Sequence, residues 1–135
     1  MQVPSYALFL FFIVHHQIIG GVAIQCCVTM ENPEQDFAPD TGIISLYHHS
    51  AGAGICMDGV GYTGLAITPS FDSMIVKYVA KGSLFSETVA MMKCVSIECR
   101  ICSVKTNILF LLNVLTRPEF EAGIVRLPSL TRILN

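Results

Sequence analysis

The residues best suited to metal or redox chemistry are Cys99 and Cys102, which form a C-x-x-C pair. Zinc takes four nitrogen or sulfur ligands, so this pair would supply half of a site. The other candidate ligands, Cys94, His48 and His49, stand at no recognised spacing from it. Thioredoxin-type redox chemistry needs a βαβ setting, which the surrounding pattern does not predict. We therefore expect no metal site.

Two histidine pairs and one aspartate are the remaining chemical candidates. His15-His16 and His48-His49 are adjacent residues, and on a strand such neighbours point to opposite faces, so neither pair is expected to chelate an ion. Asp72 stands just before an apolar run, where a turn or capping role is the default. Its surroundings, described below, also allow a role in a site.

The composition indicates a chain that must cover apolar surface. Hydrophobic residues make up 53%, charged residues only 13%, and the mean hydropathy is +0.61. Ordinary domains carry about 25% charged residues. The net charge of −2 and the absence of a basic run give no reason to expect nucleic acid as a partner.

The apolar start and the cysteines bear on where the protein works. Residues 7–14 are apolar, but a membrane-spanning helix needs about 20 residues, and no positive start or clean cleavage site marks a secretory signal. The six cysteines include the neighbours Cys26 and Cys27, an arrangement that does not suggest a disulfide framework. We expect reduced thiols, a cytoplasmic or mitochondrial setting, and neither a membrane span nor secretion.

The elements that must position these residues read as an antiparallel sheet followed by two main helices, an α+β fold. Strands are predicted at 18–29, 43–49, 55–58, 65–68, 73–80 and 101–105, and the second and third should form a hairpin across the glycine-rich link 50–54. From Ser83, a plausible N-cap, the period changes to that of a helix ending near 99. Its apolar face is Phe85, Val89, Met92 and Val95 or Ser96. Thr106 or Asn107 begins a second helix that runs to about 115.

Four ordered segments resemble the C-terminal lobe of biotin carboxylase, most closely as it occurs within pyruvate carboxylase. They are AIQCCVTMENP at 23–33 with FAPDTG at 37–42, GAGICMD at 52–58, ITPSFDSMIVK at 67–77, and VKTNI at 104–108 with FLLNVL at 110–115. The resemblance divides the chain into an apolar start outside the family (1–17), the lobe (18–125) and a divergent tail (126–135).

The resemblance implies a part of an enzyme that uses ATP, Mg and bicarbonate to carboxylate biotin carried on a partner domain. In that family an ATP-grasp region lying before the lobe supplies the phosphate loop, the metal-binding carboxylates and the bicarbonate base, none of which is found in these 135 residues. The lobe packs on that region and supplies a dimer contact. We expect this chain to bind no cofactor and to complete no reaction alone.

Several positions depart from the family pattern. Cys27 stands where the family has the arginine that holds the ureido oxygen of biotin, and a thiol is a much weaker donor than a guanidinium. Cys56 also replaces an arginine, and Ala53 a larger residue, at the dimer contact. Cys102 and Ser103 replace Arg-Gly. Asp72 matches the family's acidic residue near biotin.

Three functions remain open at this point. The first is a piece of a biotin-dependent carboxylase, inactive by itself, whose partner is the ATP-grasp part of a carboxylase. The second is a non-catalytic interaction module that pairs with another carboxylase lobe. The third is a small membrane-associated or secreted protein that uses residues 7–14. The four segments favour them in that order.

Overall fold

A four-stranded antiparallel sheet forms the centre of the protein in a computed structural model that describes residues 13–18, 20–36, 38–68, 70 and 74–122. Its strands lie in the order β1 (Ile13–Ile18), β2 (Gly21–Thr29), β9 (Met74–Gly82) and β7 (Ile55–Gly59). The predicted strands at 18–29 and 73–80 are confirmed as β2 and β9, except that β2 begins only at Gly21 and Ile18 is the last residue of β1. Strand β1 was not predicted, because the apolar start shows no alternation that distinguishes a strand from other apolar runs.

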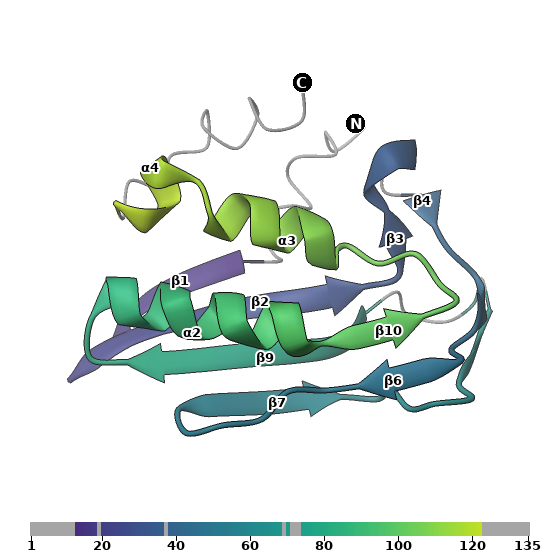
Figure 1. Ribbon diagram of the computed structural model, residues 1–135, viewed down its shortest axis with the longest axis horizontal. Helices are drawn as coiled ribbons and strands as arrows, with labels where there is room; N and C mark the ends of the chain where they lie inside the picture. The colour runs from purple at the N-terminus through teal and green to yellow at the C-terminus, as the bar shows by residue number, and fades with distance from the viewer. Residues whose placement is uncertain (1–12, 19, 37, 69, 71–73, 123–135) are drawn as a thin grey trace.

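Helices cover one face of this sheet (Figure 1). They are α2 (Phe85–Glu98), α3 (Ile108–Leu115) and the short α4 (Pro118–Glu121). Helix α2 lies along β9 and β2, and α3 packs beside it. The core between the layers is apolar and includes Ile24, Val76, Ala80, Met92 and Leu115, each fully buried. The predicted inward face of the first helix is confirmed, since Val89, Met92, Val95 and Ser96 are buried.

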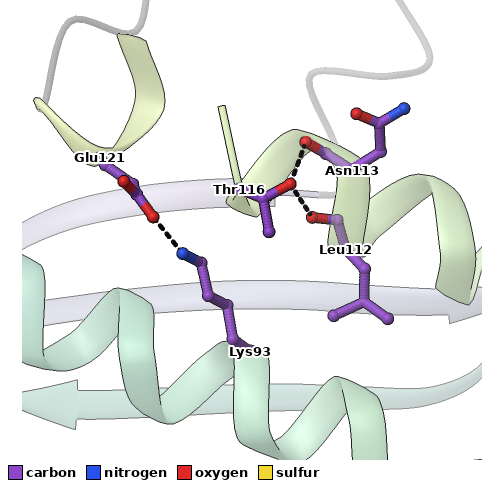
Figure 2. A network of polar contacts seen from close by, with 5 residues as sticks. All are labelled: Lys93, Leu112, Asn113, Thr116 and Glu121. Carbon is purple, nitrogen blue, oxygen red and sulfur yellow. Dashed lines mark hydrogen bonds and ion pairs between the residues drawn. The ribbon is translucent and has the colours of Figure 1, made fainter. Parts of the chain in front are cut away.

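The ends of the helices are fixed by polar contacts, but not by the predicted cap. Helix α2 begins at Phe85 with Leu84 as its N-cap, so the prediction of Ser83 in that role was wrong. Ser83, which lies just before the N-cap, instead donates its backbone N–H to Glu87 Oε2 at 3.1 Å, so a first-turn side chain reaches back to the chain that enters the helix. Figure 2 shows the Lys93–Glu121 ion pair, which ties α4 to α2.

Three two-stranded sheets complete the described fold. They pair β5 (Gly42–Ile43) with β8 (Ala66–Ile67), β6 (Leu46–His48) with β10 (Arg100–Cys102), and β3 (Glu31–Asn32) with β4 (Ala38–Pro39), with the 3-10 helix η1 (Pro33–Gln35) between the last two strands. A second small core of Met30, Ile44, Leu65, Ile67 and Ile75 lies under them.

The predicted hairpin of 43–49 with 55–58 was wrong. Strand β6 pairs with β10, more than fifty residues later, and β7 joins β9 in the central sheet. The glycine-rich link therefore connects two sheets and does not close a hairpin. The overall prediction, an α+β fold with an antiparallel sheet and two main helices, is confirmed. No helix among the described residues is long and apolar enough to cross a bilayer.

Candidate functional site

The face of the central sheet that points away from the helices carries the polar side chains. Along β2, Cys26 and Val28 point into the core, so Gln25 and Cys27 project to the other side. Cys27 lies opposite Lys77 on β9, and Lys77 lies opposite Asp58 on β7. We call this set, with Gln25 and with Cys56 one row away, the outer face. It brings residues from three strands into one continuous polar row.

Position 27 is the most enclosed part of the outer face. The Cys27 side chain is 8% exposed, and its sulfur accepts a hydrogen bond from Gln25 Nε2 at 3.9 Å. Burial raises the pKa of the Cys27 thiol, and the Gln25 hydrogen bond and the Lys77 charge oppose that rise only in part. At neutral pH the group is therefore a protonated thiol, which offers one weak donor and no charge to a bound molecule.

A lysine and an aspartate, Lys77 and Asp58, lie beside Cys27 on the outer face. Lys77 Nζ is 4.0 Å from Asp58 Oδ2, and the two side chains are 34% and 82% exposed. A pair this open to solvent is weakly coupled, so the ammonium remains available to a partner or ligand that covers the sheet. The row can therefore present a positive charge next to position 27, but without the fixed, flat donor geometry of a guanidinium.

The two predicted dimer-contact residues lie together at the edge of the sheet. Cys56 is on β7, the edge strand of the described sheet, and it is exposed. Ala53 precedes that strand, is also exposed, and lines a hollow of about 290 Å³ with Lys81, Ser83, Glu87 and neighbouring glycines. Strand β9 separates Cys56 from Cys27, so the two share a face without sharing a pocket. Asp72, predicted to lie near biotin, is outside the described residues.

The C-x-x-C pair does not form a joint site. Cys99 is buried at the end of α2, where burial raises the pKa of its thiol, and Cys102 is exposed on β10. Among the described residues, no three His, Cys, Asp or Glu side chains converge as they would around a metal ion. A hollow of about 440 Å³ near this junction is lined by His48, Glu98, Arg100 and Leu46.

One buried polar residue was not recognised from the sequence as part of the site. Asn107 is 1% exposed, and its side chain bonds the backbone of both Cys27 and Thr29. The sequence predicts Asn107 only as one of two possible helix starts, and it does occupy the N-cap of α3, without a capping side-chain bond. A polar residue before a helix predicts a cap from sequence alone, so the long-range contact with β2 had no local signal.

Comparison with known proteins matches most of this chain to one family. The family model described as "Biotin carboxylase C-terminal domain" matches residues 25–132. The pyruvate carboxylase of Pichia angusta is 46% identical over 104 residues, which are 76% of this chain and 9% of that protein. The mitochondrial pyruvate carboxylase of Rattus norvegicus is 44% identical over 108 residues, or 79% of this chain and 9% of that protein.

Solved structures show the same fold. The complete multifunctional pyruvate carboxylase from Rhizobium etli superposes with a TM-score of 0.81 at 33% identity, covering 86% of this chain and 12% of that one. The biotin carboxylase domain of the Hydrogenobacter thermophilus 2-oxoglutarate carboxylase, solved as a dimer with MgADP and bicarbonate, gives 0.78 at 29% identity, covering 86% and 26%. The chain thus spans about a tenth of the curated relatives it matches, and the resemblance read from its four segments is confirmed.

Proposed function

Because the chain belongs to the biotin carboxylase C-terminal domain family, we propose that it acts as the closing lobe of a biotin-dependent carboxylase of the pyruvate carboxylase type. In this role it covers the biotin side of the active site, and these residues do not complete the reaction by themselves. The ATP, Mg and bicarbonate chemistry belongs to an ATP-grasp region, whether on the same polypeptide or on another. We place this function in the cytoplasm or the mitochondrion.

One observation carries the proposal: Cys27, which the sequence resemblance aligns with the family's biotin-facing arginine, lies on the outer face of the sheet. Cys27 lies there beside Lys77 and Asp58, while the helices bury the other face. The lobe can therefore hold its fold with its own helices and offer the outer face to another part of the enzyme.

The residue at position 27 decides what the lobe contributes chemically. A guanidinium supplies charge-assisted donors that stabilise negative charge developing on the ureido oxygen of biotin, and a protonated thiol does not. Removing one donor of this kind typically lowers a rate by about 10²–10³-fold. We therefore propose that the chain keeps the shape of the closing lobe but contributes little to the rate.

The test combines this chain with a carboxylase chain that carries the ATP-grasp region but lacks its own closing lobe. Carboxylation of free biotin and bicarbonate-dependent ATP hydrolysis are measured for the native sequence, for Cys27→Arg and for Cys94→Arg. The last variant makes the same exchange at an exposed cysteine on α2. We expect low activity with the native sequence and with Cys94→Arg, and an increase of about 10²–10³-fold with Cys27→Arg. Activity of the native chain alone, or equal rates for both variants, would refute the proposal.

A second candidate function is that of a non-catalytic module that pairs with another carboxylase lobe. The exposure of Ala53 and Cys56 at the edge of the sheet favours it, since the sequence resemblance aligns these positions with the family's dimer contact. Tagged chain should then co-purify with a full-length carboxylase, and Cys56→Glu should abolish the association by placing a carboxylate at that contact. A chain that remains monomeric in the presence of the carboxylase would exclude this function.

A further inference from the structure

The last residues of β2 have a strand neighbour on one side only, within the part of the chain that the structure describes. Strand β1 pairs with β2 from Gly21 to Cys26, and β9 pairs with β2 on the other side. Cys27, Val28 and Thr29 lie beyond the described part of β1. Their backbone groups on that side are buried and need partners, because an unpaired buried N–H or C=O is costly.

Asn107 provides partners for three of these backbone groups. Its Oδ1 accepts the backbone N–H of Thr29 at 2.9 Å, and its Nδ2 donates to the backbone carbonyl of Cys27 at 3.1 Å. Its own backbone N–H donates to the carbonyl of Thr29 at 3.2 Å. Three hydrogen bonds therefore join one residue, which lies directly before α3, to a strand end about eighty positions earlier.

The side-chain amide takes the place of one residue of a neighbouring strand. In a parallel ladder the N–H and C=O of one residue point to the same side and join the C=O of one residue of the next strand to the N–H two residues later, and the carboxamide of Asn107 offers the same donor and acceptor. The replacement occurs where the ladder to β9 is itself irregular, since the register shifts between Val28 and Thr29. The amide therefore holds this strand end at the point where its pairing with β9 is irregular.

From these contacts we infer that Asn107 is a positioning residue for the side chain at position 27. Holding the Cys27 carbonyl and the Thr29 N–H fixes the peptide planes on both sides of Val28, and with them the direction in which residue 27 projects beside Lys77. The assignment of a biotin-facing purpose rests on the proposed function. The geometric coupling between Asn107 and the residue at 27 does not.

The experiment measures the reactivity of individual thiols in the intact chain. Each cysteine is alkylated with iodoacetamide under native conditions, and the rates at Cys27 and Cys99 are followed by peptide mass spectrometry. Both side chains are buried, but Cys99 is the C-cap of α2 and belongs to the inner core, not to the outer face. The alkylation rate of Cys99 therefore reports a general loosening of the folded chain. The variants are Asn107→Asp, which keeps the acceptor for Thr29 and loses the donor to Cys27, and Asn107→Ser, which is too short to make both bonds.

The control is Ser96→Ala, which removes a buried hydrogen bond from Ser96 Oγ to the Met92 carbonyl within α2. We expect Asn107→Asp to raise the Cys27 rate at least tenfold while the Cys99 rate changes by less than twofold, because the opening is local. Ser96→Ala should not raise the alkylation rate of Cys27 by a larger factor than that of Cys99. If Asn107→Asp does not fold, the same result is required of Asn107→Ser. A parallel rise at both thiols in the folded Asn107 variant would overturn the inference.

These outcomes are independent of the proposed function. The thiol rates are measured without ATP, biotin or a carboxylase partner, so an inactive reconstitution does not affect them. Hydrogen exchange at the Thr29 amide adds a second readout. Asn107→Asp retains the acceptor for this N–H, so its exchange should stay slow, whereas in Asn107→Ser it should accelerate at least tenfold. Equal exchange in the two variants would show that the side-chain amide does not hold the strand end.

Discussion

The two faces of the central sheet differ in what a substitution there costs. The inner face is apolar, and Ile24, Val76 and Ala80 are fully buried under α2 and α3. The outer face carries Cys27, Lys77 and Asp58 and is covered only in part by the described residues. Burial of the inner face gives the lobe its stability, so the outer face can lose a catalytic group while the fold is kept. Departures from the family are therefore expected to affect stability on one face and chemistry on the other.

Adjacent residues of β2 provide the strongest test of this difference. Ile24 points into the core and Gln25 to the outer face. Ile24→Ala should lower the free energy of unfolding by about 2–5 kcal/mol, because it leaves a cavity between sheet and helix. Gln25→Ala, one residue away, should lower it by less than about 1 kcal/mol. Urea denaturation of both variants measures the two values. Similar losses would show that the outer face is also packed against the rest of the chain.

High pH should act mainly through the inner face. Burial raises the pKa of the Cys26 thiol far above its ordinary value of 9.0, and it also raises the pKa of Cys99. A thiol whose pKa is higher in the folded protein stabilises it below pH 9, and this stability is lost as the pH rises further. The expected loss is about 1.4 kcal/mol per pH unit for each thiol that stays protonated only in the folded state.

Unfolding curves recorded from pH 8 to 10.5 check this expectation. Cys26→Ala should make the decline with pH shallower by one thiol's contribution, since it removes a thiol whose pKa is strongly raised by burial. The outer-face variant Cys27→Ser should change the slope less, because the Lys77 charge and the Gln25 hydrogen bond already oppose the rise of its pKa. A slope unaffected by either change would show that other groups control the alkaline transition.

The fold could be predicted from the sequence wherever one long element has a strong period. Strands β2 and β9 and helices α2 and α3 each bury a regular set of residues, so their type and place follow from local pattern. The pairing of β6 with β10 could not be predicted in this way. Each of these strands has only three residues, and nothing near residue 47 indicates a partner at residue 101. Local pattern favours a hairpin in such a case, because nearby strands pair more often.

One residue of the candidate site could be identified from the sequence, and another could not. Cys27 was identified because it stands within a segment that resembles the family, and the structure places it on the outer face beside Lys77. Asn107 lies in another such segment, but its contact with Cys27 spans 80 positions and uses backbone groups. A sequence shows which side chains are present, and only the folded chain shows which backbone groups need a partner.

A departure from the family on the connection between β10 and α3 should cost stability, not chemistry. Ser103 has a φ of 75°, in the left-handed region where glycine is favoured, and the sequence resemblance predicts a glycine at this position in the family. This conformation also ends β10 at Cys102, before the predicted end at 105. Ser103→Gly should raise the free energy of unfolding by about 0.5–1 kcal/mol. Ser103→Ala, which keeps the Cβ and the strain, should not, and thermal unfolding distinguishes the two.

The smallest effect is expected from the ion pair of the outer face. Lys77 and Asp58 meet at 4.0 Å with both side chains open to water, so their attraction is screened and offset by the entropy of ordering two side chains. Asp58→Asn should change the free energy of unfolding by less than about 0.5 kcal/mol at 0.15 M salt. The same change frees the Lys77 ammonium for whatever covers this face. Under the proposed function, binding of an ATP-grasp partner should therefore respond more to Asp58→Asn than stability does. Titration calorimetry and urea denaturation on one preparation compare the two responses, and a loss of stability above 1 kcal/mol without a change in binding would place Asp58 with the residues that hold the fold.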